Sequence, residues 1–181
     1  MFIAEKLRQE NIAEYLLYMW QVEDTIRAYA CNEERIAREY VPMFKLDEAK
    51  AAKMSQWYAQ LCAMMRSEGV KEKGHLQINK NIVAELPELS QHLLESHGYA
   101  KYHSAYFHAL PDIMELRKKG NGSTLSDIEV CFNALYGVMM LRMAKKPVSE
   151  GTETAAKEIS SVMAMLAAYY KQNKKEPLSF D

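Results

Sequence analysis

The sequence is poor in glycine and proline, the residues that most often interrupt helices, with 7 and 5 in 181 positions. It also lacks the two-residue alternation of valine, isoleucine and threonine that is typical of strands. The best case, Leu76-Gln77-Ile78-Asn79, is too short to build a sheet. Methionine, leucine and alanine are plentiful instead, and 49% of the residues are hydrophobic. We therefore predict an all-α fold, with residues 1–181 in a single helical domain.

An excess of charge of either sign is also absent. The formal net charge is -1, so no overall basic field attracts nucleic acid or an anionic membrane. No uncharged stretch reaches the roughly 20 residues that span a bilayer. The first residues contain no apolar signal core. We therefore predict a cytoplasmic protein that binds neither nucleic acid nor membrane.

Cysteine is scarce and odd in number, with Cys31, Cys62 and Cys131 far apart in the chain. Each lies within a helical pattern, which indicates free thiols packed as small hydrophobic side chains in a reducing compartment. A carboxylate-bridged di-metal bundle needs two E-x-x-H motifs, and the chain has one, EKGH at residues 72–75. Because glycine-rich phosphate loops and G-x-S-x-G turns are absent as well, we predict no metal, no cofactor and no catalytic residue.

Apolar residues recur at steps of three and four along most of the chain, which predicts helices. Asp47, Ser126 and Ser149 are suited to cap helix starts, and Pro87 is expected to kink a helix or divide it in two. Short connections favour an up-and-down bundle of six or seven helices. The predicted helices cover about residues 3–30, 33–40, 47–68, 75–95, 100–119, 126–146 and 149–173, with the clearest loop at 120–123 and a mobile tail at about 174–181.

One stretch, CFNALYGVMMLRM at residues 131–143, is apolar almost all round. A helix without a polar face must be enclosed by protein or by lipid. Lipid is excluded because Asp127, Glu129 and Arg142 leave too short an uncharged run. We therefore predict that the helix of about Ser126-Lys146 lies at the centre of the bundle.

Several polar side chains fall on helix faces that should be apolar. On the first helix, Glu14 and Tyr18 lie on one line close to the apolar run at residues 15–20. On the fourth helix, His75 and Asn79 extend the apolar stripe near the helix start, where free backbone N–H groups can receive an anion. Asn133 lies on the helix predicted to be central. These five residues either gather into a ligand pocket or cap helices and satisfy one another across the core.

Two further patterns concern ion pairs and subunit contacts. Glu23 and Arg27 have the spacing and order of a favourable i,i+4 ion pair. Stripes of aromatic residues and methionines could leave an apolar face for a second subunit, because bundles of this size commonly dimerise. The stripes in question contain Trp57, Tyr58, Met64 and Met65 on one helix and Tyr169 and Tyr170 on the last.

Three segments are similar to a known group of proteins: residues 10–24 (ENIAEYLLYMWQVED), 72–89 (EKGHLQINKNIVAELPEL) and 131–143 (CFNALYGVMMLRM). Together with the length and the order of the segments, they resemble an uncharacterised domain-of-unknown-function family of small all-helical proteins associated with Bacteroidales bacteria. The resemblance covers essentially the whole chain and implies an all-α fold in a bacterial cytoplasm. It implies no activity, cofactor or catalytic residue.

The sequence therefore leaves two functions open. The first is a non-enzymatic helical bundle that acts through subunit or partner contacts, most simply as a homodimer, and the patterns favour it slightly. The alternative is a small-molecule-binding or enzymatic bundle with a polar pocket near Glu14, His75 and Asn79.

Overall fold

The computed structural model describes residues 2–120 and 124–181. Within these ranges the regular structure is entirely helical, so the all-α prediction is confirmed, while most of the predicted loop at 120–123 lies outside them. The α-helices are α1 (Phe2–Glu10), α2 (Ile12–Ala28), α3 (Glu33–Arg35), α4 (Glu48–Ser67), α5 (Gln77–Glu95), α6 (Ala100–Lys119), α7 (Asp127–Met143) and α8 (Glu150–Lys175). Three short turns of π- or 3-10 helix are η1 (Ile36–Tyr40), η2 (Val41–Phe44) and η3 (His97–Tyr99).

Local capping decides where most of these helices begin. The three starts predicted from capping residues are confirmed at Asp47, Ser126 and Ser149. The predicted helix at residues 3–30 is instead two helices, because the side chain of Asn11 accepts hydrogen bonds from the backbone N–H groups of Ala13 and Glu14 and starts α2. The apolar stripe continues across this break, so periodicity alone does not reveal it. α5 runs through Pro87 as one helix.

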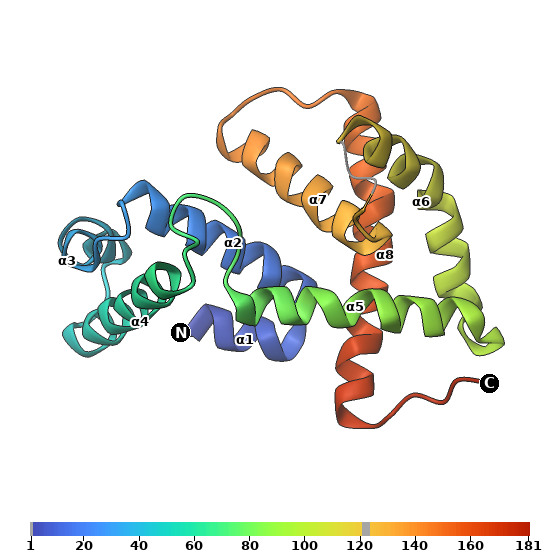
Figure 1. Ribbon diagram of the computed structural model, residues 1–181, viewed down its shortest axis with the longest axis horizontal. Helices are drawn as coiled ribbons and strands as arrows, with labels where there is room; N and C mark the ends of the chain where they lie inside the picture. The colour runs from blue at the N-terminus through green and yellow to red at the C-terminus, as the bar shows by residue number, and fades with distance from the viewer. Residues whose placement is uncertain (1, 121–123) are drawn as a thin grey trace.

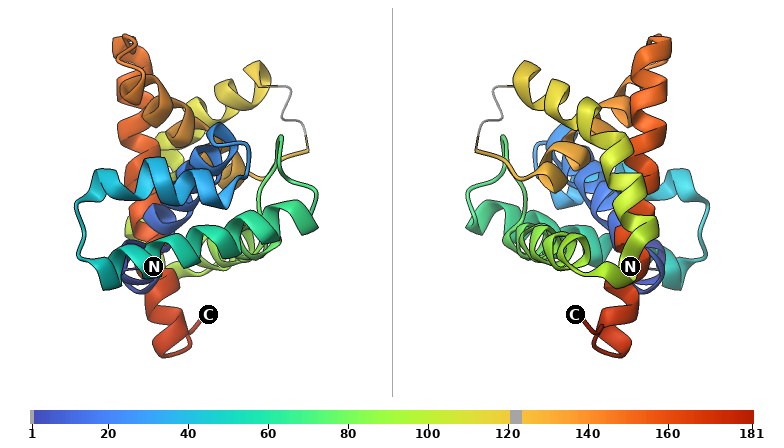
Figure 2. Two further views of the ribbon diagram at one scale, coloured as in Figure 1. Left: turned by 90° about the vertical axis from the view of Figure 1, so that its left-hand side faces the viewer. Right: turned by 90° about the vertical axis from the view of Figure 1, so that its right-hand side faces the viewer.

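α2 and α8 each contact several other helices. α2 touches α1, α4, α5, α7 and α8, and α8 touches α2, α5, α6 and α7. Figure 1 shows α8 crossing α5 steeply, and the side views in Figure 2 agree. The bundle therefore contains crossing helices as well as neighbours that run side by side.

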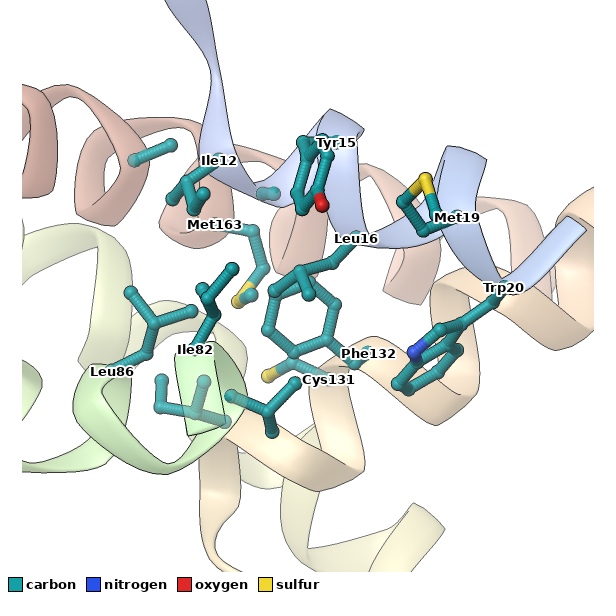
Figure 3. Close-up of a cluster of buried hydrophobic side chains, with 14 of the residues drawn as sticks. Ile12, Tyr15, Leu16, Met19, Trp20, Ile82, Leu86, Cys131, Phe132 and Met163 are labelled. Atoms are coloured by element: carbon teal, nitrogen blue, oxygen red, sulfur yellow. The ribbon is translucent and has the colours of Figure 1, made fainter. Parts of the chain in front are cut away.

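The core lies where α2, α5, α7 and α8 meet (Figure 3). α2 contributes Leu16 and Trp20, α5 contributes Leu86, α7 contributes Phe132 and α8 contributes Met163, all of them buried. These residues belong to one continuous apolar cluster that also includes members of α1, α4 and α6. Because each large apolar side chain contributes about 1.5–3 kcal/mol when fully buried, this cluster holds the site-bearing helices in place.

The prediction that α7 lies at the centre of the bundle is wrong. Ile128, Val130, Cys131 and Phe132 are buried, but the end of the helix is not: Met140, Leu141 and Met143 are 38%, 36% and 53% exposed. An apolar surface patch has the same all-round pattern as an enclosed helix, so the pattern could not separate the two. Figure 1 shows this end of α7 at the edge of the molecule. No helix of the described ranges, α7 included, is long and apolar enough to cross a membrane.

The end of the chain folds back onto α5 and η3. The ring of Phe180 lies against His92 and Tyr99, at centroid distances of 5.1 Å and 5.8 Å. The Tyr99 hydroxyl donates to the backbone carbonyl of Ser179 at 2.8 Å. Mobility of residues 174–181 stays a prediction, and these contacts count against it.

Candidate functional site

The centre of the site is Glu23, a carboxylate in the middle of α2 with no exposed surface. Its Oε1 accepts hydrogen bonds from the backbone N–H of Leu76 at 3.1 Å and from Nδ2 of Asn79 at 2.7 Å. Its Oε2 lies 2.6 Å from Nδ1 of His75. Burial of an unpaired carboxylate costs several kcal/mol, and these three donors offset that cost. Glu23 thereby caps the start of α5, where Leu76 has no capping side chain of its own.

His75 is held in one orientation by two neighbours. Because the carboxylate of Glu23 accepts, Nδ1 of the ring carries the hydrogen. The ring also stacks on Trp20, with centroids 4.1 Å apart and planes inclined by 14°. Nε2 has no hydrogen-bond partner among the described residues, and 31% of the side chain is exposed. In the neutral ring, Nε2 therefore presents a lone pair that can accept a hydrogen bond or a proton.

The loop before α5 is fixed by Arg27. Its guanidinium donates to the backbone carbonyl of Gly74 and to Asp24, the latter at 2.6 Å. Gly74 has a φ of 87°, a conformation that side chains with a Cβ rarely adopt. The expected pair between Glu23 and Arg27 is not formed, because Glu23 points into the core and Arg27 pairs with Asp24 instead.

Tyr136 of α7 joins the site from the side. Its hydroxyl donates to Asp24, and its ring meets Trp20 edge-on with centroids 5.5 Å apart. Burial and the hydrogen bond to Asp24 raise the pKa of Tyr136 well above its usual value, so the phenol remains a donor. Side chains of α2, α5 and α7 are thus tied together around the indole ring, whose core neighbours are drawn in Figure 3.

A pocket of about 660 Å³ opens beside His75 between α5 and α7. This volume lies within the roughly 300–1,000 Å³ that is usual for small-molecule sites. Pro87 has no N–H to donate, so the carbonyl of Val83 lacks its usual helical partner, and both residues line the pocket. The lining residues are Trp20, His75, Gln77, Lys80, Asn81, Val83, Ala84, Pro87, Leu125, Glu129 and Asn133.

The structure brings together three of the five predicted site residues. His75 and Asn133 line the pocket, and Asn79 lies behind His75 on the same carboxylate. Glu14 is outside the pocket: it is exposed and accepts a hydrogen bond from Asn11 at 2.9 Å. Tyr18 is also outside it, half-buried beside Tyr40 and Tyr58, where burial first and then Tyr40 raise its pKa.

The separation of Glu14 from the pocket follows from helix geometry. At roughly 100° per residue, the nine steps from Glu14 to Glu23 place them about 180° apart on α2. The residue that sequence reasoning missed is Glu23, and a signal for it exists. Ile12, Leu16, Met19, Glu23 and Ile26 follow steps of four, three, four and three. A carboxylate at the fourth position of a buried stripe indicates a buried, partnered acid.

The expectation that the start of α5 leaves N–H groups for an external anion is wrong at two positions. The N–H of Leu76 is taken by Glu23, and that of Gln77 by Oε2 of Glu68 at 2.6 Å. The chain's own carboxylates therefore satisfy these helix-terminal donors. Over the described ranges, no three histidine, cysteine, aspartate or glutamate side chains are grouped as a metal ion would require.

The family model described as "Domain of unknown function (DUF4924)" matches residues 1–177. The chain belongs to this family. The match confirms the resemblance to an uncharacterised domain-of-unknown-function family over nearly the whole chain. No curated protein and no solved structure matches the chain.

Proposed function

We propose that this protein binds a small molecule in the pocket between α5 and α7, and that His75 contacts the ligand. The observation that supports this is the fully buried Glu23 holding His75 at the pocket wall. A single serine, aspartate or asparagine is enough to cap a helix. Here a carboxylate is instead buried to fix an imidazole 52 residues away. A carboxylate that orients a histidine is the arrangement used for hydrogen bonding to ligands and for proton transfer.

Native mass spectrometry on the protein purified without added metal is the first test. We expect extra mass that disappears on denaturation, and we expect the His75→Gln variant to lose it. His97→Gln is the matched control, because His97 lies in η3, away from the pocket. Two results together would count against the proposal. The first is a mass equal to that of the chain alone, and the second is that no compound of a metabolite panel shifts the NMR signals of the His75 ring.

A second proposed function, a module acting through subunit contacts as a homodimer, is supported by the exposed end of α7. Met140, Leu141 and Met143 leave apolar side chains open to solvent there, and such patches often mark interaction sites. Beside them a groove of about 490 Å³ lies between α6, α7 and α8. Gly137 lines it, and a Cβ at this glycine would meet nothing within 4 Å. The stripes on α4 and α8 are less open, since all their members are buried or half-buried.

Sedimentation velocity across a range of concentrations tests the second function. We expect self-association that weakens in the Leu141→Glu variant. Met43→Glu is the control, since Met43 is a 67% exposed methionine on η2, away from this surface. A chain that stays monomeric at all concentrations would argue against the homodimer.

We also propose a bacterial, cytoplasmic setting. The sequence resemblance supports the first part, and the three free, buried thiols support a reducing compartment. Fractionation of a producing bacterial cell followed by immunoblotting tests this, and recovery in the periplasmic fraction would contradict it.

A further inference from the structure

The pocket carries opposite charges on its two walls. Lys80 comes from α5, and Glu129 comes from the first turn of α7. Neither side chain forms an ion pair among the described residues, with the other or with any neighbour. Because both line one pocket, the space between them is open to a ligand that pairs with each.

Glu129 is a fixed acceptor. Its Oε2 accepts hydrogen bonds from the backbone N–H and the hydroxyl of Ser126, both at 2.8 Å, in a capping box. Its Oε1 has no hydrogen-bond partner in the part of the chain that the structure describes. The capping contacts therefore hold the Glu129 side chain in place, so that Oε1 can accept from a donor in the pocket. The side chain then has little conformational entropy left to lose when a ligand binds.

The rest of the lining is apolar along one side. Val83, Ala84 and Pro87 of α5 face the pocket together with Leu125 from the segment before α7. The volume of about 660 Å³ is enough for a charged head and an aliphatic side chain together.

We propose that the pocket takes a small zwitterion of the amino-acid type. Its ammonium group donates to Oε1 of Glu129, its carboxylate pairs with Nζ of Lys80, and its aliphatic part lies against Val83 and Pro87. This assignment rests on the proposed small-molecule function and adds the ligand class. A ligand with only one charge would leave either Lys80 or Glu129 without a partner. The pocket should therefore select a zwitterion over a singly charged ligand.

The test uses NMR titration of the full chain with the standard amino acids at millimolar concentration. For the best binder, the matched amine without the carboxylate and the matched acid without the amino group are then compared. For leucine these are 3-methylbutylamine and 4-methylpentanoate. We expect the amino acid to bind about tenfold more tightly than either fragment, which is about 1.4 kcal/mol, since each fragment lacks one of the two charged contacts.

Two variants separate the charges. Glu129→Gln keeps a residue type that completes a capping box, and should weaken the amino acid and the amine but not the acid. Lys80→Met, at an exposed helical position, should weaken the amino acid and the acid but not the amine. The controls away from the pocket are Glu158→Gln, at a half-buried position like that of Glu129, and Lys53→Met, at an exposed position like that of Lys80.

The outcomes distinguish the ligand class from the function. Fragments that bind as tightly as the amino acid, or pocket variants that behave like the controls, would overturn the zwitterion. If no amino acid binds but another compound shifts the His75 signals, the proposed small-molecule function is supported and the zwitterion proposal is wrong. If nothing shifts those signals and no mass co-purifies, both proposals fall.

Discussion

Replacement of Glu23 by alanine should be among the most damaging single changes in the chain. The substitution removes the acceptor of three N–H groups, two of which belong to the fully buried Leu76 and Asn79. Each buried donor left without a partner costs about 1–3 kcal/mol. The side chain of His75 is partly exposed, so its N–H can donate to water instead. The expected loss is therefore roughly 4 kcal/mol, out of the 5–15 kcal/mol typical of a folded domain.

Glu23→Gln separates the charge from the shape. The amide oxygen can still accept from Leu76 and Asn79, but the amide NH₂ now faces Nδ1 of His75. The ring should respond by moving its hydrogen to Nε2, so that Nδ1 becomes the acceptor. We therefore expect a smaller loss of stability than for alanine and a switch of the His75 tautomer.

Urea unfolding followed by circular dichroism measures the stabilities, and ¹⁵N chemical shifts of the imidazole report the tautomer. Glu14→Ala and Glu14→Gln are matched controls, because Glu14 is an exposed glutamate of the same helix. A Glu23→Ala variant within about 1 kcal/mol of Glu14→Ala would refute the reasoning, since it would show that the buried donors do not depend on Glu23. An unchanged tautomer in Glu23→Gln would refute the assignment of the hydrogen to Nδ1.

Three other predictions concern the rest of the fold. Asn11→Ala should cost about 1 kcal/mol through loss of the α2 cap, and Asn11→Asp should not, as thermal unfolding would show. Burial raises the pKa of Cys131 to about 12 and that of Cys62 to about 11, and it also raises the pKa of Cys31. Ellman's reagent should therefore label the native chain only as fast as the chain opens. A fast phase of labelling in the native chain would contradict this. Burial raises the pKa of Tyr102 from 10.0 to about 12, so between these values the unfolded chain releases a proton that the native one keeps. Stability should therefore fall as pH rises through that range, and less so in Tyr102→Phe.

Helix starts were predictable where one side chain and its own backbone decide them. Asp47, Ser126 and Ser149 cap within three residues, so the short sequence pattern contains the whole interaction. Asn11 caps α2 in the same way, but the apolar stripe continues across it, so the sequence pattern did not reveal this helix start. The position of α7 was not predictable, because its exposed end is no less apolar in sequence than its buried part.

Composition and periodicity by themselves determined the all-helical fold, because helix formation depends on residues only three or four positions apart. Tertiary structure alone decided the candidate site. Glu23 meets His75 across 52 residues, and Glu129 and Lys80 line one pocket from two different helices. Such pairs depend on how α2, α5 and α7 cross, and the crossing is set by the shape of the packed core around Trp20 and Phe132. No local pattern encodes that shape, so a carboxylate that looked like half of a surface ion pair is the buried centre of the site.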